Sequence, residues 1–170
     1  SMSPRYVSRL LWAAMLISGS SASALFLPAP EHTLFHDDFE SKMIDPSFWT
    51  ISGGASVRLL DIGGNHCVRF RSPDSSPTYY RGELSFQVDL AAYESVRLAF
   101  KAMARGNLTP PPDHPFVGGC DGNGVAISPD GNTWYPVRDF NDLTFSFQEI
   151  VINLDDAIEA WSLNYTDTFH

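Results

Sequence analysis

The sequence predicts an all-β fold: a two-sheet antiparallel β-sandwich of the jelly-roll kind, with one short helix near the C-terminus. From residue 35 onward, short β-type runs alternate with Gly, Pro, Asn and Asp at the spacing typical of a sandwich. Several runs have a period of two. Val96, Leu98 and Phe100, for example, share one face of their run, which indicates a sheet with one buried face. A helical period occurs only once, late in the chain.

The expected strands are rich in Val, Phe, Tyr and Trp, which suit a pleated, half-buried surface. They cover residues 35–40, 49–53, 57–61, 66–72, 81–90, 95–104, 124–128, 134–139 and 145–153. Between the sixth and seventh of these, residues 104–119 read as one long irregular stretch. Its three consecutive prolines cannot lie in a central strand.

The helix is expected directly after the last strand, where apolar residues recur at i, i+3, i+4 and i+7. Asn153 can cap it, and two aspartates follow where the helix dipole favours negative charge. The apolar stripe consists of Leu154, Ala157, Ile158 and Trp161. We expect it to close one end of the sandwich, with Trp161 as a core plug.

Residues 1–24 have the pattern of a signal peptide, with Arg5 and Arg9 before a short apolar run and small residues before Ala24. We therefore expect a secreted or cell-surface protein, with a leader at residues 25–33 and the module at residues 34–170. The apolar run is too short to cross a bilayer, so no membrane span is expected after cleavage. Loss of the two arginines would take the net charge from −9 to −11, an acidity that disfavours binding to nucleic acid.

A new β-run begins at Thr168, two residues before the last position of the sequence. We expect that the module is truncated here and lacks its closing strand. The chain would then be the N-terminal part of a larger extracellular or surface protein, with further domains after it.

Six segments occur in an order that resembles the jelly-roll modules of the MAM and reelin-repeat type in the concanavalin A-like group, above all those of large secreted bacterial proteins. They are HDDFES, SFWT, GNHCVRF, RGELSFQVDL, SVRLAFKA and DGNGVAISPDGNTWYPV. In such modules the acidic first strand lies beside the closing strand and often binds a structural calcium ion. The resemblance implies Asp37, Asp38 and Glu40 as calcium ligands, with partner acids after His170.

The segment SPDGNTW resembles the Asp box of sialidases, with one residue fewer between the Asp and the Gly than is usual. Pro129, Asp130 and Gly131 are strong turn formers. We expect Ser128, Asp130, Gly131 and Trp134 to build a structural hairpin turn rather than a catalytic site.

Motifs for catalysis are missing from the sequence. A sandwich glycosidase presents alternating acids along one strand, which no strand here has, and no nucleophile elbow or Walker glycine pattern occurs. Tyr79, Tyr80 and Tyr135 lie near turns and could stack on sugar rings, although they could equally cover the edge of the core. We expect any ligand at the rim formed by residues 73–80 and 105–120.

Two cysteines, Cys67 and Cys120, would reach an oxidising compartment, so the sequence allows one disulfide or two separate thiols. The sequence thus predicts a secreted, non-catalytic interaction module that binds a glycan or an extracellular protein. The alternatives are a β-sandwich glycoside hydrolase or sialidase-like enzyme, and a purely structural spacer.

Overall fold

The protein is an all-β sandwich with one short helix, as the sequence predicts. The computed structural model describes residues 8–10, 15–21, 32–53, 56–71, 82–105, 108–120 and 122–170. These residues form β1 (Ser8–Leu10), β2 (Met15–Ser21), β3 (His32–Asp37), β4 (Thr50–Gly53), β5 (Ser56–Ile62), β6 (Asn65–Arg71), β7 (Gly82–Ser85), β8 (Tyr93–Arg105), β9 (Phe116–Val117), β10 (Gly124–Ile127), β11 (Thr133–Asp139), β12 (Gln148–Asn153) and α1 (Leu154–Trp161). All strand pairs are antiparallel.

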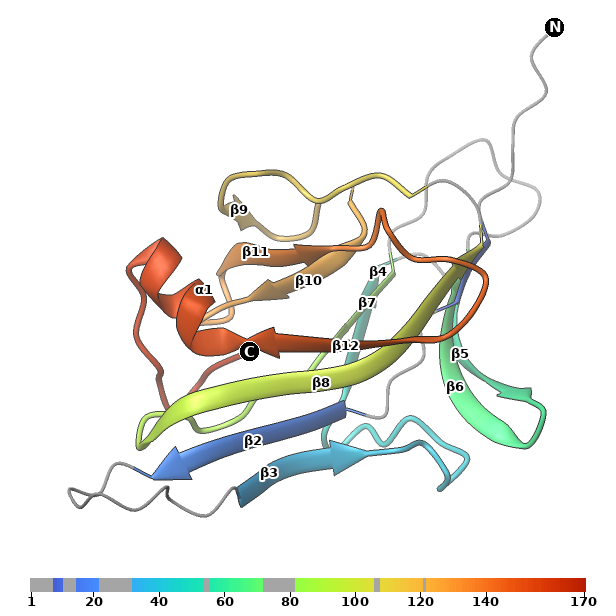
Figure 1. Cartoon of the computed structure of the whole chain (residues 1–170), viewed down its shortest axis with the longest axis horizontal. Coiled ribbons are helices and arrows are strands. Elements are labelled where there is room, and N and C mark those ends of the chain that lie inside the picture. The colour runs from blue at the N-terminus through green and yellow to red at the C-terminus, as the bar shows by residue number, and fades with distance from the viewer. Residues whose placement is uncertain are drawn as a thin grey trace, which may run out of the picture.

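The long strand β8 is the centre of the larger sheet, whose order is β3-β2-β8-β1-β6-β5, with β12 as a further partner of β8 (Figure 1). Val96, Leu98 and Phe100 of β8 are buried in the main core, where Ile150 and Ile152 of β12 join them. The period of two in these strands therefore orients the sheet, because alternate side chains point to opposite faces.

A second layer contains two smaller sheets, β10-β11-β9 and β4-β7. The last residues of the chain lie between them. The Phe169 carbonyl accepts from the Val88 amide at 2.8 Å, while Ser128 and His170 exchange two backbone hydrogen bonds of 2.8 and 2.9 Å. Phe169 is only 2% exposed. Residues 166–170 therefore connect the β7 side of this layer to the β10 side.

Strands β1 and β2 lie within the segment that the sequence predicts to be a signal peptide. Strand β2 is placed between β3 and β8 and pairs with both. If residues 1–24 are cleaved off, the facing edges of β3 and β8 lose their shared neighbour. Strand β1, which lies between β8 and β6, would be lost as well. The sheet would then have to close two gaps, each the width of one strand, at about 4.8 Å per strand spacing.

Helix α1 begins and ends as its sequence predicts. The Asn153 side chain accepts from the Asp155 amide at 3.3 Å, and Ser162 ends the helix in the left-handed conformation with φ of 55°. Tyr165 donates to Asp155 Oδ1 at 2.6 Å and so ties the chain after the helix to its first turn. The helix packs near β8 at one end of the sandwich (Figure 1).

Some strand bounds differ from those expected. Strand β3 begins at His32, inside the predicted leader, and ends at Asp37 because Phe39 turns the chain with a positive φ of 59°. Strand β12 begins three residues later than expected, after an exposed turn that contains Phe145. The irregular stretch contains the two-residue strand β9, which pairs with Thr133 and Trp134 of β11.

An aromatic cluster at the start of the module holds β3, the loop after it and the chain after β7 together. The Trp49 ring lies 5.4 Å from Phe35, 5.7 Å from Phe39 and 5.1 Å from Phe86, between ring centroids. The carboxylate of Asp37 fixes this loop by two hydrogen bonds. Its Oδ2 accepts from Trp49 Nε1 and its Oδ1 from the Phe39 amide, both at 2.7 Å. These bonds hold Phe39, which has no exposed surface, in its left-handed conformation.

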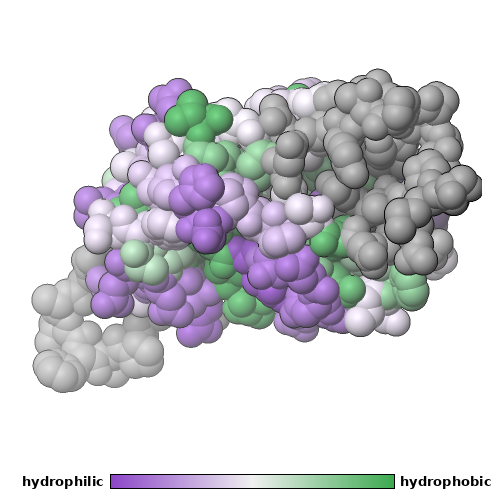
Figure 2. Space-filling view, turned by 90° about the horizontal axis from the view of Figure 1, so that it is seen from above, coloured by the Kyte–Doolittle hydropathy of each residue, from purple (hydrophilic) through white to green (hydrophobic). Residues whose placement is uncertain are grey.

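Apolar side chains also occur at the surface. On the face that Figure 2 shows, they form separate patches with polar side chains between them. The large apolar residues with most exposure are Met43, Phe48, Ile51, Val117, Phe145 and Val151. Within the described ranges, none of the helical structure is long and apolar enough to cross a membrane.

We predict that Asp37→Asn destabilises the protein by about 1–3 kcal/mol, because an amide nitrogen would face one of the two donors and leave it unsatisfied. Chemical denaturation measures this change. Asp38→Asn is the matched control, since Asp38 accepts only from the Glu40 amide in an exposed turn and an asparagine oxygen can do the same. Equal effects of the two substitutions would show that Asp37 does not hold the loop.

Candidate functional site

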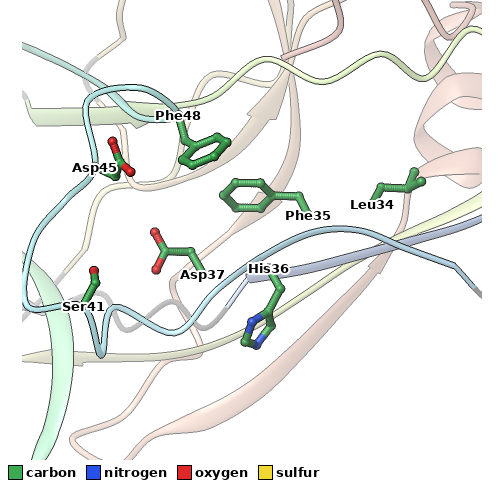
Figure 3. Close-up of a pocket in the computed structure, with 7 residues that line it drawn as sticks. All are labelled: Leu34, Phe35, His36, Asp37, Ser41, Asp45 and Phe48. Atoms are coloured by element: carbon green, nitrogen blue, oxygen red, sulfur yellow. The ribbon is translucent and has the colours of Figure 1, made fainter.

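A hollow of about 350 Å³ opens beside the aromatic cluster, between β3 and the loop that follows it. We call it the aromatic hollow. Strand β3 supplies one wall, and the loop from Asp38 to Trp49 supplies the other. It is lined by Leu34, Phe35, His36, Asp37, Ser41, Asp45 and Phe48, all labelled in Figure 3.

Two carboxylates face this hollow. Those of Asp37 and Asp45 reach toward the same space from the strand and from the loop (Figure 3). Asp45 Oδ1 accepts from the backbone amide of Ser47 at 2.8 Å and from its hydroxyl at 2.7 Å. These hydrogen bonds hold the pKa of Asp45 below its ordinary value, so this carboxylate is ionised at neutral pH.

The apolar side of the hollow consists of two phenylalanine rings. Phe48 is 59% exposed, and its ring meets Phe35 edge-on with centroids 5.9 Å apart. Phe35 is itself stacked on Phe86 at 4.6 Å, so it is fixed from behind. The result is a rigid inner ring and an exposed outer ring on the same side of the space.

The arrangement combines a flat apolar surface with hydrogen-bond acceptors. The carboxylate oxygens of Asp37 and Asp45 have lone pairs beyond those engaged by protein donors. Ser41 adds a hydroxyl, which donates to the Met43 carbonyl at 3.3 Å and can accept from a ligand. The hollow therefore suits a small ligand that has an apolar face and several hydroxyl donors.

Comparison with protein-family models, with curated proteins and with solved structures finds no match to this chain. The similarity to MAM and reelin-repeat modules therefore stays a prediction from the sequence.

The residues predicted to bind calcium have separate hydrogen-bond partners. Asp37 bonds to Trp49 and Phe39. Asp38 closes a local turn, and Glu40 Oε2 lies 3.1 Å from His66 Nδ1 on the β5–β6 hairpin. Across the residues that the structure describes, no three His, Cys, Asp or Glu side chains converge as a metal site would require. A structural calcium ion stays a prediction of the sequence.

Of the predicted ligand-binding tyrosines, the structure describes Tyr135, which does not line the aromatic hollow. Tyr79 and Tyr80 lie outside the described residues. Tyr135 is half-buried at the edge of the core, where its ring lies 5.7 Å from that of Trp161. The sequence prediction missed Phe48 and Asp45, which lie in the segment DPSFW. The signal that could have indicated this site is an acidic residue three positions before a pair of aromatic residues.

Cys67 and Cys120 are both thiols in the structure. Cys67 is buried on β6 next to Met103, and its Sγ donates to the Leu60 carbonyl at 3.2 Å. Cys120 is half-buried on the loop before β10. Of the two alternatives that the sequence leaves open, the structure has the separate thiols.

The Asp-box-like segment forms a tight turn between β10 and β11. Asp130 Oδ1 accepts from the amides of Asn132 and Thr133 at 2.8 and 3.0 Å. Ser128, which has no exposed surface, accepts from the Gly131 amide at 2.9 Å. Gly131 has a positive φ of 72°, which a glycine adopts without strain.

The end of the chain covers this turn. The His170 ring meets Trp134 edge-on with centroids 5.9 Å apart, and Thr166 donates its hydroxyl to the Pro129 carbonyl at 2.7 Å. Burial lowers the pKa of His170, with Asp130 acting weakly against it. Ser128, Asp130, Gly131 and Trp134 thus lie together in a region packed against the chain's own residues rather than in an open site.

We predict that Asp130→Asn reduces the acid sensitivity of the protein. The amides of Asn132 and Thr133 hold the pKa of Asp130 below its ordinary value of 3.8. Because the folded-state pKa is depressed, this group's contribution to stability is complete above pH 3.8 and is lost as the pH falls through the folded-state pKa. The free energy of unfolding of the variant should therefore fall less steeply below pH 3.8. An unchanged slope in that range would contradict the proposed hydrogen bonds.

Proposed function

We propose that this protein is a secreted, non-catalytic module that binds a neutral saccharide in the aromatic hollow. The single observation that carries the proposal is the position of the exposed Phe48 ring beside the carboxylates of Asp37 and Asp45. A sugar ring has an apolar face of C–H groups and a rim of hydroxyl donors. Phe48 offers the matching flat surface, and the carboxylates offer the matching acceptors.

The charge of the hollow selects among saccharides. Asp45 is ionised at neutral pH, and no lysine or arginine lines the hollow within the described part of the chain. An acidic sugar would therefore meet uncompensated repulsion. The hydroxyl groups of a neutral sugar donate hydrogen bonds to the carboxylates without that cost.

The same groups support binding over catalysis. A glycosidase needs one carboxylic acid with a raised pKa to protonate the leaving group. In the hollow, hydrogen bonds from Ser47 displace the pKa of Asp45 downward. Asp113, Asp130 and Asp142, outside the hollow, have pKa values displaced in the same direction by their hydrogen bonds. Such groups act as acceptors and not as acids at neutral pH.

The proposed location depends on the sequence. The charged, apolar and small-residue zones of residues 1–24 support export. A sugar-binding module is useful in that setting, because it can hold the rest of a protein at a glycan surface.

We predict that Phe48→Ala weakens saccharide binding by about tenfold or more. A fully buried phenylalanine contact contributes about 1.5–3 kcal/mol, and each 1.4 kcal/mol corresponds to a factor of ten in affinity. The measurement is a neutral-glycan array, followed by calorimetry on the strongest glycan found.

Phe145→Ala is the matched control, because Phe145 is 71% exposed on the turn before β12 and belongs to no part of the hollow. It should bind like the wild-type protein. Equal loss in both variants, or binding of acidic glycans in preference to neutral ones, would overturn the proposal. Silence on the array would favour a spacer, and release of shorter sugars from a bound glycan would favour the glycosidase alternative.

A further inference from the structure

A second hollow, separate from the aromatic hollow, lies between β11, β12 and α1. It has a volume of about 500 Å³. Residues 136–138 of β11 form one side, residues 151–153 of β12 form the other, and one face of α1 closes the end. In Figure 1, β11 lies above β12, and α1 lies at the left end of the two strands. We call this hollow the helix groove.

One edge of β12 is open along the helix groove. Strand β12 pairs with β8 over all six of its residues, and within the described residues no strand pairs with its other edge. Every second backbone N–H and C=O group of such a strand points away from its neighbour. Natural edge strands are usually guarded by lysine, proline or a bulge. The sequence of β12, QEIVIN, contains neither lysine nor proline, its one charged residue is the exposed Glu149, and its register with β8 is unbroken.

The groove has an apolar surface next to that edge. Val151 lines it with 58% of its surface exposed, although its neighbours Ile150 and Ile152 are buried. Ala157 and Ala160 of α1 leave room beside it, because their side chains are short. Trp161 forms the far wall and is held there by a hydrogen bond from Nε1 to the Pro136 carbonyl at 3.2 Å.

The charges around the groove are mainly negative. Arg138 donates two hydrogen bonds to the carboxylate of Asp142, at 2.6 and 2.7 Å, and lies 3.8 Å from Asp139. Asp156 lines the groove from the helix. Arg138 and Asp156 line the groove itself, whereas Asp139 and Asp142 lie beside Arg138, and Asp142 is paired with it. Three carboxylates thus accompany one guanidinium. An occupant with positive charge would be attracted, and an acidic one repelled.

We propose that the helix groove binds an extended, basic peptide segment of a partner protein, which adds to β12 as a further strand. The open strand edge supplies the backbone hydrogen bonds, as in other cases of β-strand addition. Val151 and the alanines of α1 receive an apolar side chain at alternate positions of the peptide. The carboxylates around Arg138 and on α1 receive its lysine or arginine side chains. This proposal is independent of saccharide binding, because the two hollows share no residue.

The test uses the full chain, labelled with ¹⁵N, and a blocked hexapeptide of alternating lysine and valine. Titration followed by NMR should shift the amide signals of residues 148–153 and the indole signal of Trp161. Val151→Lys should weaken binding by about tenfold or more, since an edge lysine both opposes strand pairing and repels the peptide. Val117→Lys is the matched control, because Val117 is 78% exposed on β9, outside the groove; it should bind like the wild-type protein.

Two further peptides separate the contributions of backbone and charge. A peptide with alternate backbone amides methylated cannot complete a strand ladder, and one with glutamate in place of lysine reverses the charge; both should fail to bind. Equal binding of either peptide would overturn the proposal, as would shifts confined to other strand edges or equal affinity of the two lysine variants. Self-association of the chain through β12 would also overturn it, since the occupant would then be a second copy. Phe48→Ala should leave peptide binding unchanged.

Discussion

The aromatic hollow and the cluster beside it depend on the hydrogen bonds that the Asp37 carboxylate accepts. Its two oxygens bond to the Phe39 amide and to the Trp49 indole, twelve residues away from Asp37 in sequence. The first bond turns the chain sharply at the end of β3, and the second draws the far end of the loop back against the strand. Because the Trp49 ring then packs among Phe35, Phe39 and Phe86, one carboxylate sets both the aromatic cluster and the opening beside it. Asp45 and Phe48 face the hollow because the loop that carries them is closed in this way.

The sequence predicts the fold class because the responsible signals are local and periodic. Val96, Leu98 and Phe100 alternate in a strand that the structure buries on that same side, and Leu154, Ala157, Ile158 and Trp161 define α1. The turn at Asp130 is likewise predicted by the residues that form it. The prediction is poorer where a bound depends on a distant contact. The left-handed Phe39 ends β3 earlier than its β-type neighbours suggest, and β9 is a two-residue strand that exists only beside Thr133 and Trp134.

The candidate site was less accessible to prediction than the fold, for the same reason. Its residues come from a strand and from an irregular loop. The long-range bond between Asp37 and Trp49, together with the contacts of the Phe35 ring, brings them together. Tyr135 shows that residue type alone does not reveal packing. A tyrosine near a turn could bind a sugar ring, but the Tyr135 ring packs against Trp161 at the edge of the core. The exposure that distinguishes Phe48 from Phe35 depends on the tertiary fold and has no local signature.

The position of residues 166–170 has a consequence for how the chain is made. These residues join positions near 88 to positions near 128, so the second layer cannot close until residues 166–170 have left the ribosome. Contacts of such large separation in sequence form slowly, and synthesis proceeds from the N-terminus. The second layer of the nascent chain would therefore stay open until residue 170 has been translated. The export that we propose would suit such a chain, because a machinery that threads unfolded chains would meet it before the second layer has closed.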